Sequence, residues 1–90
     1  GAEIGKNTIL NSGAIIEHDC RIGAHVHIAP GVTLCGNVVV GDYTFIGAGA
    51  TVIEGVTIGS NVMVGAGSVV NRDIPDNVIS VGVPSKIISK

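Results

Sequence analysis

The sequence has almost no aromatic side chains: one Phe, one Tyr and no Trp among 90 residues. A core without large rings must be filled by many small aliphatic side chains, and 29 residues are Ile, Leu or Val. Glycine, with 14 residues, is about twice as frequent as usual. Ninety residues form one domain with a modest core, so this composition favours a repeat of small, similar units.

Charge of either sign is also scarce. A net charge of −2 gives no reason to expect nucleic acid or an anionic membrane as partner. No apolar run approaches the length of a membrane span, and the first residues, GAEIGKN, do not resemble a signal peptide. Two cysteines without a secretory segment predict free thiols in a reducing compartment. The expected location is the cytoplasm.

A period of six runs through most of the chain. Every sixth residue from Ile4 is Ile, Leu or Val, without exception up to Val70. Two residues before each of these large side chains lies a residue no larger than Val. The large series is Ile4, Leu10, Ile16, Ile22, Ile28, Leu34, Val40, Ile46, Val52, Ile58, Val64 and Val70, and glycine often follows a member, as at Gly5 and Gly41.

This period excludes an amphipathic helix, whose apolar residues recur at three and four. It indicates short extended segments, each with one large and one small inward side chain, joined by corners at which we expect glycine to relieve backbone strain. Three segments close a triangular coil of eighteen residues, so residues 1–72 form about four coils stacked about 4.8 Å apart. The predicted fold is an all-β parallel β-helix with capped ends.

The pattern is expected to stop after residue 72. The next inward position is Asp76, and Pro75 before it has no N–H for a ladder. Residues 73–90 therefore read as a C-terminal cap and tail with a short strand over 78–81. Gly1 begins directly in the repeat without a comparable cap, so we expect coils or a domain upstream.

Residues eighteen apart should stack, which places Gly36 directly above His18. The expected result is open backbone beside an imidazole. On another edge, the segments around Ala48 and Ala66 form a column almost bare of side chains, along which a long, thin ligand could lie. The structural alternative is that Gly and Ala simply make tight corners.

Most of the chemistry lies in residues 16–27, IEHDCRIGAHVH. An isolated outward histidine is more often a solvated surface residue than a catalyst. His18, however, is flanked by Glu17 and Asp19, either of which could orient the ring and stabilise its charged form. A second outward histidine, His27, lies half a coil further on. These features favour a catalytic role for His18.

The segment EHDC-x-I-G-x-H-x-H-I-A-P-G, followed by CGNV and by the tail GVPSK, resembles a known family. It is similar to the sialic acid O-acetyltransferase and UDP-4-amino-sugar N-acetyltransferase family of hexapeptide-repeat enzymes. The resemblance implies that the β-helix is left-handed. It also implies that His18 is the general base with Asp19 or Glu17 as its orienting acid, and that Gly36 offers its N–H to the acetyl carbonyl.

The resemblance further implies a co-substrate and an assembly. Acetyl-CoA would be bound by His27 near its thioester, by Ala48 and Ala66 along the pantetheine arm, and by the tail at Pro84 and Lys86 near the nucleotide. Active sites would lie between the subunits of a homotrimer, and no metal is expected. Family members carry an N-terminal α/β domain for the acceptor, which is absent from this chain.

The predicted function is acetyl-CoA-dependent acetylation of a sugar, with N-acetylation of a nucleotide-linked amino sugar preferred. The alternatives are a sialic acid O-acetyltransferase and a non-catalytic scaffold or fragment. A γ-type carbonic anhydrase shares this type of scaffold, but its zinc site needs three converging ligands. His25 and His27 lie at different positions along one segment, which disfavours that interpretation.

Overall fold

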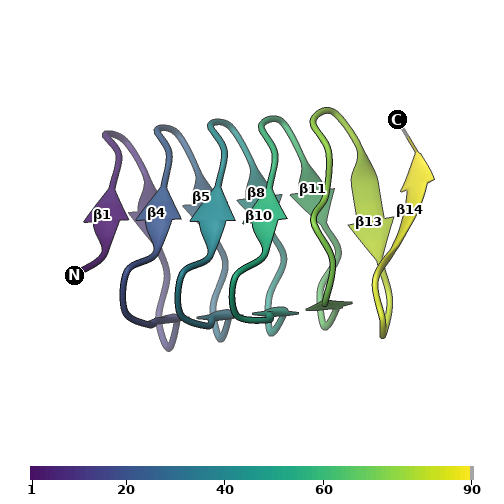
Figure 1. The fold of residues 1–90 in the computed structure, drawn as a ribbon, viewed down its shortest axis with the longest axis horizontal. Coiled ribbons are helices and arrows are strands. Elements are labelled where there is room, and N and C mark those ends of the chain that lie inside the picture. Colours follow the sequence, from purple (N-terminus) through teal and green to yellow (C-terminus); the bar gives the residue numbers. More distant parts are fainter. Residues whose placement is uncertain (90) are drawn as a thin grey trace.

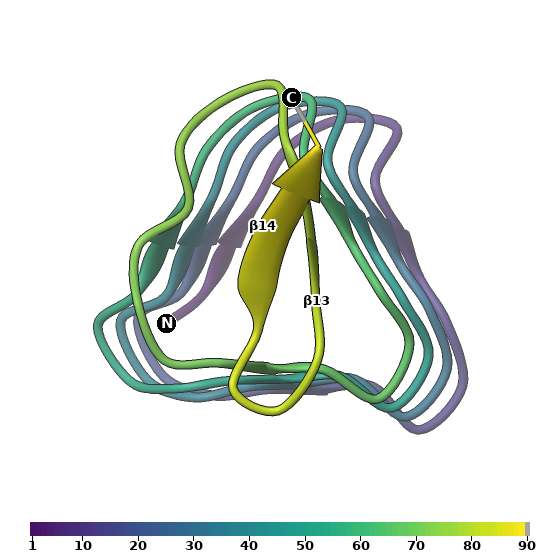
Figure 2. The same ribbon diagram turned by 90° about the vertical axis from the view of Figure 1, so that its right-hand side faces the viewer.

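The chain winds into a solenoid in the computed structural model, which describes residues 1–89 (Figure 1). Seen from the C-terminal end, each coil is a triangle, and the chain runs clockwise as it approaches the viewer (Figure 2). That direction defines a left-handed coil. The molecule measures 31 × 22 × 20 Å along its principal axes. The predicted left-handed parallel β-helix is therefore confirmed.

Three sheets form the sides of the prism. We call them face A (β1, β4, β7, β10), face B (β2, β5, β8, β11, β13, β14) and face C (β3, β6, β9, β12). The strands are β1 (Glu3–Ile4), β2 (Ile9–Leu10), β3 (Ile15–Ile16), β4 (Arg21–Ile22), β5 (His27–Ile28), β6 (Thr33–Leu34), β7 (Val39–Val40), β8 (Phe45–Ile46), β9 (Thr51–Val52), β10 (Thr57–Ile58), β11 (Met63–Val64), β12 (Val69–Val70), β13 (Ile79–Val81) and β14 (Lys86–Ser89).

The register between stacked coils is eighteen residues, as the sequence period predicts. On face B, His27 pairs with Phe45 and Phe45 pairs with Met63, all in parallel strands. The ladder is held by backbone hydrogen bonds such as that from the N–H of His27 to the carbonyl of Thr44, at 3.0 Å. Residues along an edge therefore have fixed neighbours in the coils above and below.

Two-residue corners join the faces. Corner one comprises residues 6–7, 24–25, 42–43, 60–61 and 76–77; corner two comprises 12–13, 30–31, 48–49 and 66–67; corner three comprises 18–19, 36–37 and 54–55. The second residue of these corners has a positive φ, as at Asp19 (59°) and Tyr43 (60°). Asp and Asn tolerate this conformation, whereas Tyr rarely adopts it.

The glycines that follow the large inward residues were expected to relieve backbone strain at the corners, but the structure gives them a different role. Gly5 and Gly41 are absent from the residues with positive φ, so they relieve no left-handed strain. Instead, a methyl group on Gly5 would lie 2.6 Å from the backbone of Gly23 in the next coil, and one on Gly41 would lie 2.6 Å from Gly59. Close approach of successive coils is what requires glycine here.

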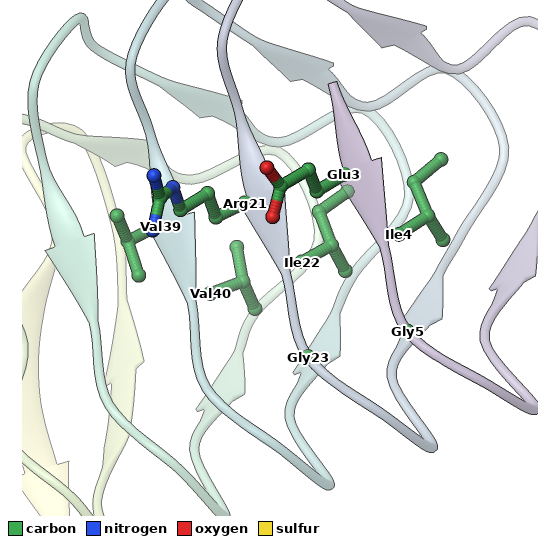
Figure 3. A pocket seen from close by; sticks show the side chains of 8 residues that line it. All are labelled: Glu3, Ile4, Gly5, Arg21, Ile22, Gly23, Val39 and Val40. Atoms are coloured by element: carbon green, nitrogen blue, oxygen red, sulfur yellow. The ribbon is translucent and has the colours of Figure 1, made fainter. Parts of the chain in front are cut away.

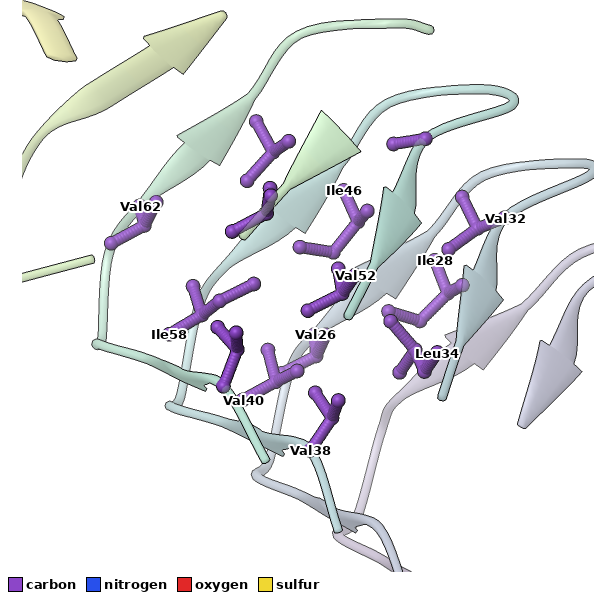
Figure 4. Close-up of a cluster of buried hydrophobic side chains, with 14 of the residues drawn as sticks. Val26, Ile28, Val32, Leu34, Val38, Val40, Ile46, Val52, Ile58 and Val62 are labelled. Atoms are coloured by element: carbon purple, nitrogen blue, oxygen red, sulfur yellow. The ribbon is translucent and has the colours of Figure 1, made fainter. Parts of the chain in front are cut away.

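The interior is filled by the two predicted inward series (Figure 4). Ile28, Leu34 and Ile46 are 0% exposed, and smaller residues such as Val32 fill the spaces between them. Buried polar atoms are bonded: Thr44, also inward, donates its hydroxyl hydrogen to the carbonyl of Gly59 at 2.7 Å. Burial of each large aliphatic side chain contributes about 1.5–3 kcal/mol, so stability rises coil by coil.

The coil path continues beyond residue 72 through a corner that is two residues shorter. Ile74 pairs with Ile58, and Ile79 of β13 pairs with Met63, so the register falls from eighteen to sixteen. Ile74 and Val78 thereby take inward positions, and Asp76 lies outside at corner one. β14 then runs antiparallel to β13 across the open end of the triangle (Figure 2).

Candidate active site

His18 stands at corner three, between β3 on face C and β4 on face A. Its side chain is 66% exposed, because the corner projects it away from the aliphatic interior. The neighbouring residue Asp19 has the positive φ that the corner requires, a conformation that its short polar side chain tolerates. The local sequence thus combines a corner former with an imidazole.

The ring of His18 lies against Gly36 of the next coil. A methyl group on Gly36 would come within 2.6 Å of both Nε2 and Cε1 of the ring. Gly36 is therefore buried beneath the imidazole, whereas the sequence led us to expect exposed backbone at this position. The contact fixes Nε2 beside the backbone of Gly36, and any larger residue would displace the ring.

Asp19, rather than Glu17, is the acid in contact with His18. Nδ1 of His18 lies 3.4 Å from Oδ2 of Asp19, within ion-pair range. The hydrogen bond to His18 lowers the pKa of Asp19 from its usual value. Asp19 is therefore a carboxylate at neutral pH, and it holds the hydrogen of His18 on Nδ1. Nε2 is left as the basic nitrogen.

The N–H of Gly36 has no acceptor in the described part of the chain, a property that it shares with the N–H of Asp42, Ala48 and Glu54. At the equivalent position of corner one, the N–H of Ala24 donates to Oδ1 of Asp42 at 2.9 Å, and that of Ser60 donates to Oδ1 of Asp76 at 2.8 Å. Within residues 1–89, the Gly36 N–H donates to no protein acceptor. A fixed donor beside a base is the arrangement that stabilises a developing oxyanion.

His27 lies on the outer side of face B, half-buried. Nδ2 of Asn11 donates to Nε2 of His27 at 2.9 Å and to the carbonyl of Ile28 at 3.0 Å. The ring also packs against Phe45, with centroids 5.0 Å apart. Asn11 thus orients His27 and leaves the hydrogen of the neutral ring on Nδ1. Sequence reasoning did not single out Asn11, although a polar residue one coil below and beside a histidine was a usable signal.

The bare column predicted along Ala48 and Ala66 is present at corner two. Both alanines are exposed. The glycines that follow them, Gly49 and Gly67, have φ of 70°, and a methyl group on either would have nothing within 4 Å. No side chain therefore obstructs this edge over two successive coils, which suits a thin, extended ligand.

The tail residues Pro84 and Lys86 lie at the C-terminal end of the prism. They line a hollow of about 160 Å³ together with Asn71, Arg72 and Ser85. Arg72 is a candidate site residue that the sequence reasoning missed, although the eighteen-residue stacking had already placed it on the same edge as His18. Its position above Glu54 on that edge was the available signal.

Two further hollows lie on the face A side of His18. One, of about 340 Å³, is lined by residues of face A that include Glu3, Arg21, Val39 and Gly23 (Figure 3). The other, of about 220 Å³, is lined in part by Asp19, Arg21 and Asn37. Polar and charged side chains therefore reach the space beside the catalytic candidate from this face.

The structure does not bring His18 and His27 together within one chain. His18 stands at corner three, and corner three is opposite face B, which carries His27 (Figure 2). The aliphatic interior separates them. A ligand that touches both imidazoles must therefore lie between two copies of the chain.

Residues 1–89 contain no group of three His, Cys, Asp or Glu side chains placed to hold a metal ion. In the same part of the chain, no helix is long and apolar enough to span a membrane.

Cys20 is buried, and its thiol lies 3.2 Å from the carbonyl of Cys35. Burial, with Glu17 and Glu54 nearby, raises the pKa of the half-buried Cys35 thiol.

The repeat, its corners and this side-chain arrangement define a class of protein. The model of the bacterial transferase hexapeptide family, built of six repeats, matches residues 1–36 and again 37–72. The chain belongs to this family of hexapeptide-repeat transferases.

Solved structures narrow the comparison. The chain is 50% identical to GDP-perosamine N-acetyltransferase from Caulobacter crescentus, solved as a histidine variant with CoA and GDP-perosamine, at a TM-score of 0.97 over 99% of this chain and 42% of that one. It is 39% identical to the acetyltransferase domain of PglB from Neisseria gonorrhoeae, solved with acetyl coenzyme A. The TM-score is 0.88, over 97% of this chain and 45% of that one. Serine acetyltransferase of Neisseria gonorrhoeae is 34% identical to the chain. Its TM-score is 0.93, over 99% of this chain and 39% of that one. The chain thus spans less than half of each of these relatives.

Proposed function

We propose that the protein transfers an acetyl group from acetyl-CoA to the amine of a nucleotide-linked sugar. The observation that carries this proposal is the contact between His18 and Gly36: Nε2 of the imidazole lies against a glycine whose N–H has no protein acceptor. The similarity to a GDP-perosamine N-acetyltransferase bound to CoA and GDP-perosamine supports the substrate class. O-acetylation of a sugar hydroxyl is the alternative.

The residues supply the two elements that direct acyl transfer requires. His18 accepts the proton of the amine as the nitrogen–carbon bond forms at the thioester carbonyl, and then returns a proton to the departing thiolate as the carbon–sulfur bond breaks. The Gly36 N–H donates to the oxyanion of the tetrahedral intermediate, an interaction worth about 3–4 kcal/mol in comparable sites. Asp19 keeps His18 in the tautomer that this proton transfer needs.

We propose further that the active enzyme is a homotrimer with its sites between copies. This assembly would place corner three of one copy against face B of the next, so that His18 and the partner's His27 reach the same thioester. The exposed apolar side chains of face B support it: Ile9 is 52%, Phe45 36% and Met63 49% exposed in the single chain. A neighbouring copy would cover them.

In this proposal, the remaining predicted residues divide between the two substrates. The bare edge at Ala48 and Ala66 of the copy that supplies His27 holds the pantetheine arm, because corner two borders face B, and the tail at Pro84 and Lys86 lies at the nucleotide end of the arm. The acceptor enters from the face A side, where Arg21 and Asn37 line the hollow beside Asp19. We place the reaction in the cytoplasm, which the two free thiols support.

The test is release of thiol from acetyl-CoA in the presence of nucleotide-linked amino sugars, sialic acid and simple amines. The expected result is turnover with an amino sugar that falls at least about a hundredfold in His18→Ala. His25→Asn is the matched control, since it removes an imidazole from corner one and keeps a residue suited to positive φ. Binding of acetyl-CoA without turnover of any acceptor would contradict the proposed activity.

A further inference from the structure

Tyr43 is the residue least suited to its place in corner one. In three coils the corner-one residue with positive φ is asparagine: Asn7, Asn61 and Asn77. Tyr43 takes that place at a φ of 60°, which a bulky side chain adopts only at a cost in stability. The residue is nevertheless 64% exposed, although the ring of His25 stacks on it at 4.9 Å. A strained residue that buries little in its own chain indicates a function that involves another molecule.

Tyr43 continues an apolar surface of face B. With Phe45 and Met63, which are 36% and 49% exposed, it lines a hollow of about 260 Å³ at the border between corner one and face B. The single Phe and the single Tyr of the sequence therefore meet at this border. Exposed apolar surface of this kind is typical of contacts between protein chains. It joins the part of face B that we propose to meet the neighbouring copy.

The proposed assembly determines what corner one faces. Corner three lies between faces C and A, and it points at face B of the next copy, which is bordered by corner one and corner two. All copies wind in the same direction (Figure 2). Face A of one copy is therefore turned toward corner one of the next, and face C toward corner two. Since the pantetheine arm lies at corner two, corner one and face A meet on the other side of the contact.

Copies in this arrangement stand nearly level. His18 and the partner's His27 differ by nine residues, or half a coil, which is about 2.4 Å of height at about 4.8 Å per coil. Each outward residue of face A therefore lies level with the corner-one residues that follow it three or four positions later in the sequence. The chemistry of such pairs can be compared directly.

Two of these level pairs are complementary. Glu3 lies level with the partner's Lys6, and within residues 1–89 neither side chain forms an ion pair. Val39 lies level with the partner's Tyr43; it is 36% exposed and lines the hollow of about 340 Å³ on face A (Figure 3). An ion pair and an apolar contact two coils apart define both the side of the contact and its register.

The acceptor keeps a route to His18 in this arrangement. The hollow of about 220 Å³ beside Asp19 is lined in part by Gly1, so it lies at the N-terminal end of the prism. Val39 lies two coils above Glu3, further from that end. An acceptor that approaches from the N-terminal end does not compete with Tyr43 for face A.

We propose that corner one of each copy docks on face A of its neighbour, with Tyr43 against the partner's Val39 and Lys6 against the partner's Glu3. The occupant of this surface is a second copy of the chain. The inference rests on the proposed function and goes beyond it, because it assigns the surface that holds the copies in register. The strain at Tyr43 is then offset by the cover that its ring gains in the assembly.

Sedimentation velocity over a range of concentrations tests the docking without any substrate. Tyr43→Asn gives corner one the residue that it has in other coils, so we expect the isolated chain to unfold at the same or a higher temperature. Association should nonetheless weaken at least about tenfold, as for an aromatic residue at the centre of an interface. Ile88→Asn is the matched control: it replaces a 63% exposed apolar residue in the tail and should leave association unchanged.

Charge reversal tests the second contact. Glu3→Lys and Lys6→Glu should each weaken association about fivefold, and the double variant should return to within about twofold of the wild type. Failure of the double variant to recover overturns this ion pair. Association that is unchanged in Tyr43→Asn, or equally weakened in Ile88→Asn, overturns the docking surface alone. A wild-type chain that stays monomeric at every concentration overturns the proposed assembly with it. Thiol release from the same samples reports the proposed activity separately, and thermal unfolding verifies that each variant is folded.

Discussion

Corner one and corner three have the same backbone and different chemistry. Both have a second residue with positive φ, as His25 (58°) and Asp19 (59°) show. At corner one, however, the carboxylates of Asp42 and Asp76 accept the N–H groups of Ala24 and Ser60, and the rings of His25 and Tyr43 stack at 4.9 Å. At corner three, Gly36 leaves its N–H free, and the space beside it is taken by an imidazole.

This difference shows how a repeat protein builds a site on a regular scaffold. At corner one, the carboxylates of Asp42 and Asp76 accept the N–H groups of Ala24 and Ser60 in the coil below. At corner three, the residue above Gly36 is Glu54, which accepts no hydrogen bond from it, so the N–H of Gly36 has no protein acceptor. Substitutions at the two corners test this contrast.

The largest effect is expected at the base of corner three. His18→Ala should lower kcat at least about a hundredfold, because no other group at this corner can accept the proton at neutral pH. His25→Asn at corner one should leave kcat within about twofold, because it keeps the backbone conformation and touches no reacting group. Steady-state kinetics measure both, and equal losses in the two variants would refute the contrast.

Gly36→Ala should have the next largest effect. Its methyl group would lie 2.6 Å from Nε2 of His18, so the ring must move from its present position against Gly36. We expect kcat to fall by about ten- to a hundredfold, since a misplaced base loses most of its advantage. Ser60→Ala, at the equivalent position of corner one, should be nearly silent in the same assay. An active Gly36→Ala would show that the contact is not required.

Asp42→Ala should lower the stability of the protein and leave its activity unchanged. It removes the acceptor of the Ala24 N–H, at 2.9 Å, and should lower the free energy of unfolding by about 1 kcal/mol. Thermal or denaturant unfolding measures this loss. A fall in kcat of Asp42→Ala as large as that of Gly36→Ala would contradict the purely structural role assigned to corner one.

The smallest effect concerns the thiol beside the site. Because burial, Glu17 and Glu54 raise the pKa of Cys35, less of it is thiolate at pH 8 than in a free peptide. Alkylation by iodoacetamide should therefore be a few-fold slower than for a model peptide and should continue to accelerate as the pH rises further. Glu17→Gln combined with Glu54→Gln should raise the rate at pH 8. A rate equal to that of the peptide would contradict the assigned pKa shift.

The fold could be predicted almost completely from the sequence, because a strict period leaves few alternatives. The inward series, the eighteen-residue register and the number of coils follow from residues such as Ile28 and Ile46. The handedness came from family resemblance, and the role of Gly41 was misjudged because coil-to-coil clearance is a property of three dimensions. The shortened corner before Ile74 was missed because a two-residue deletion resembles the end of the pattern.

The contacts of the site that depend only on which residues stack in successive coils could be predicted from the sequence. The contact of His18 with Gly36 follows from a separation of eighteen residues. Side-chain orientation does not follow from it, so the choice of Asp19 over Glu17 and the bond from Asn11 to His27 required the structure. The catalytic and cofactor-binding roles of these residues stay predictions until they are measured.

The proposed active site draws on two chains, and co-expression of the His18→Ala and His27→Ala variants, each expected to be inactive alone, tests this arrangement. His18→Ala retains His27, and His27→Ala retains His18, so a mixed assembly contains interfaces with both histidines intact. Random mixing in equal amounts should restore about a quarter of the wild-type sites in a cyclic assembly. We expect acetyl transfer to recover in mixtures and not in either variant alone. Mixed assemblies that stay inactive, although both chains are present, would contradict it.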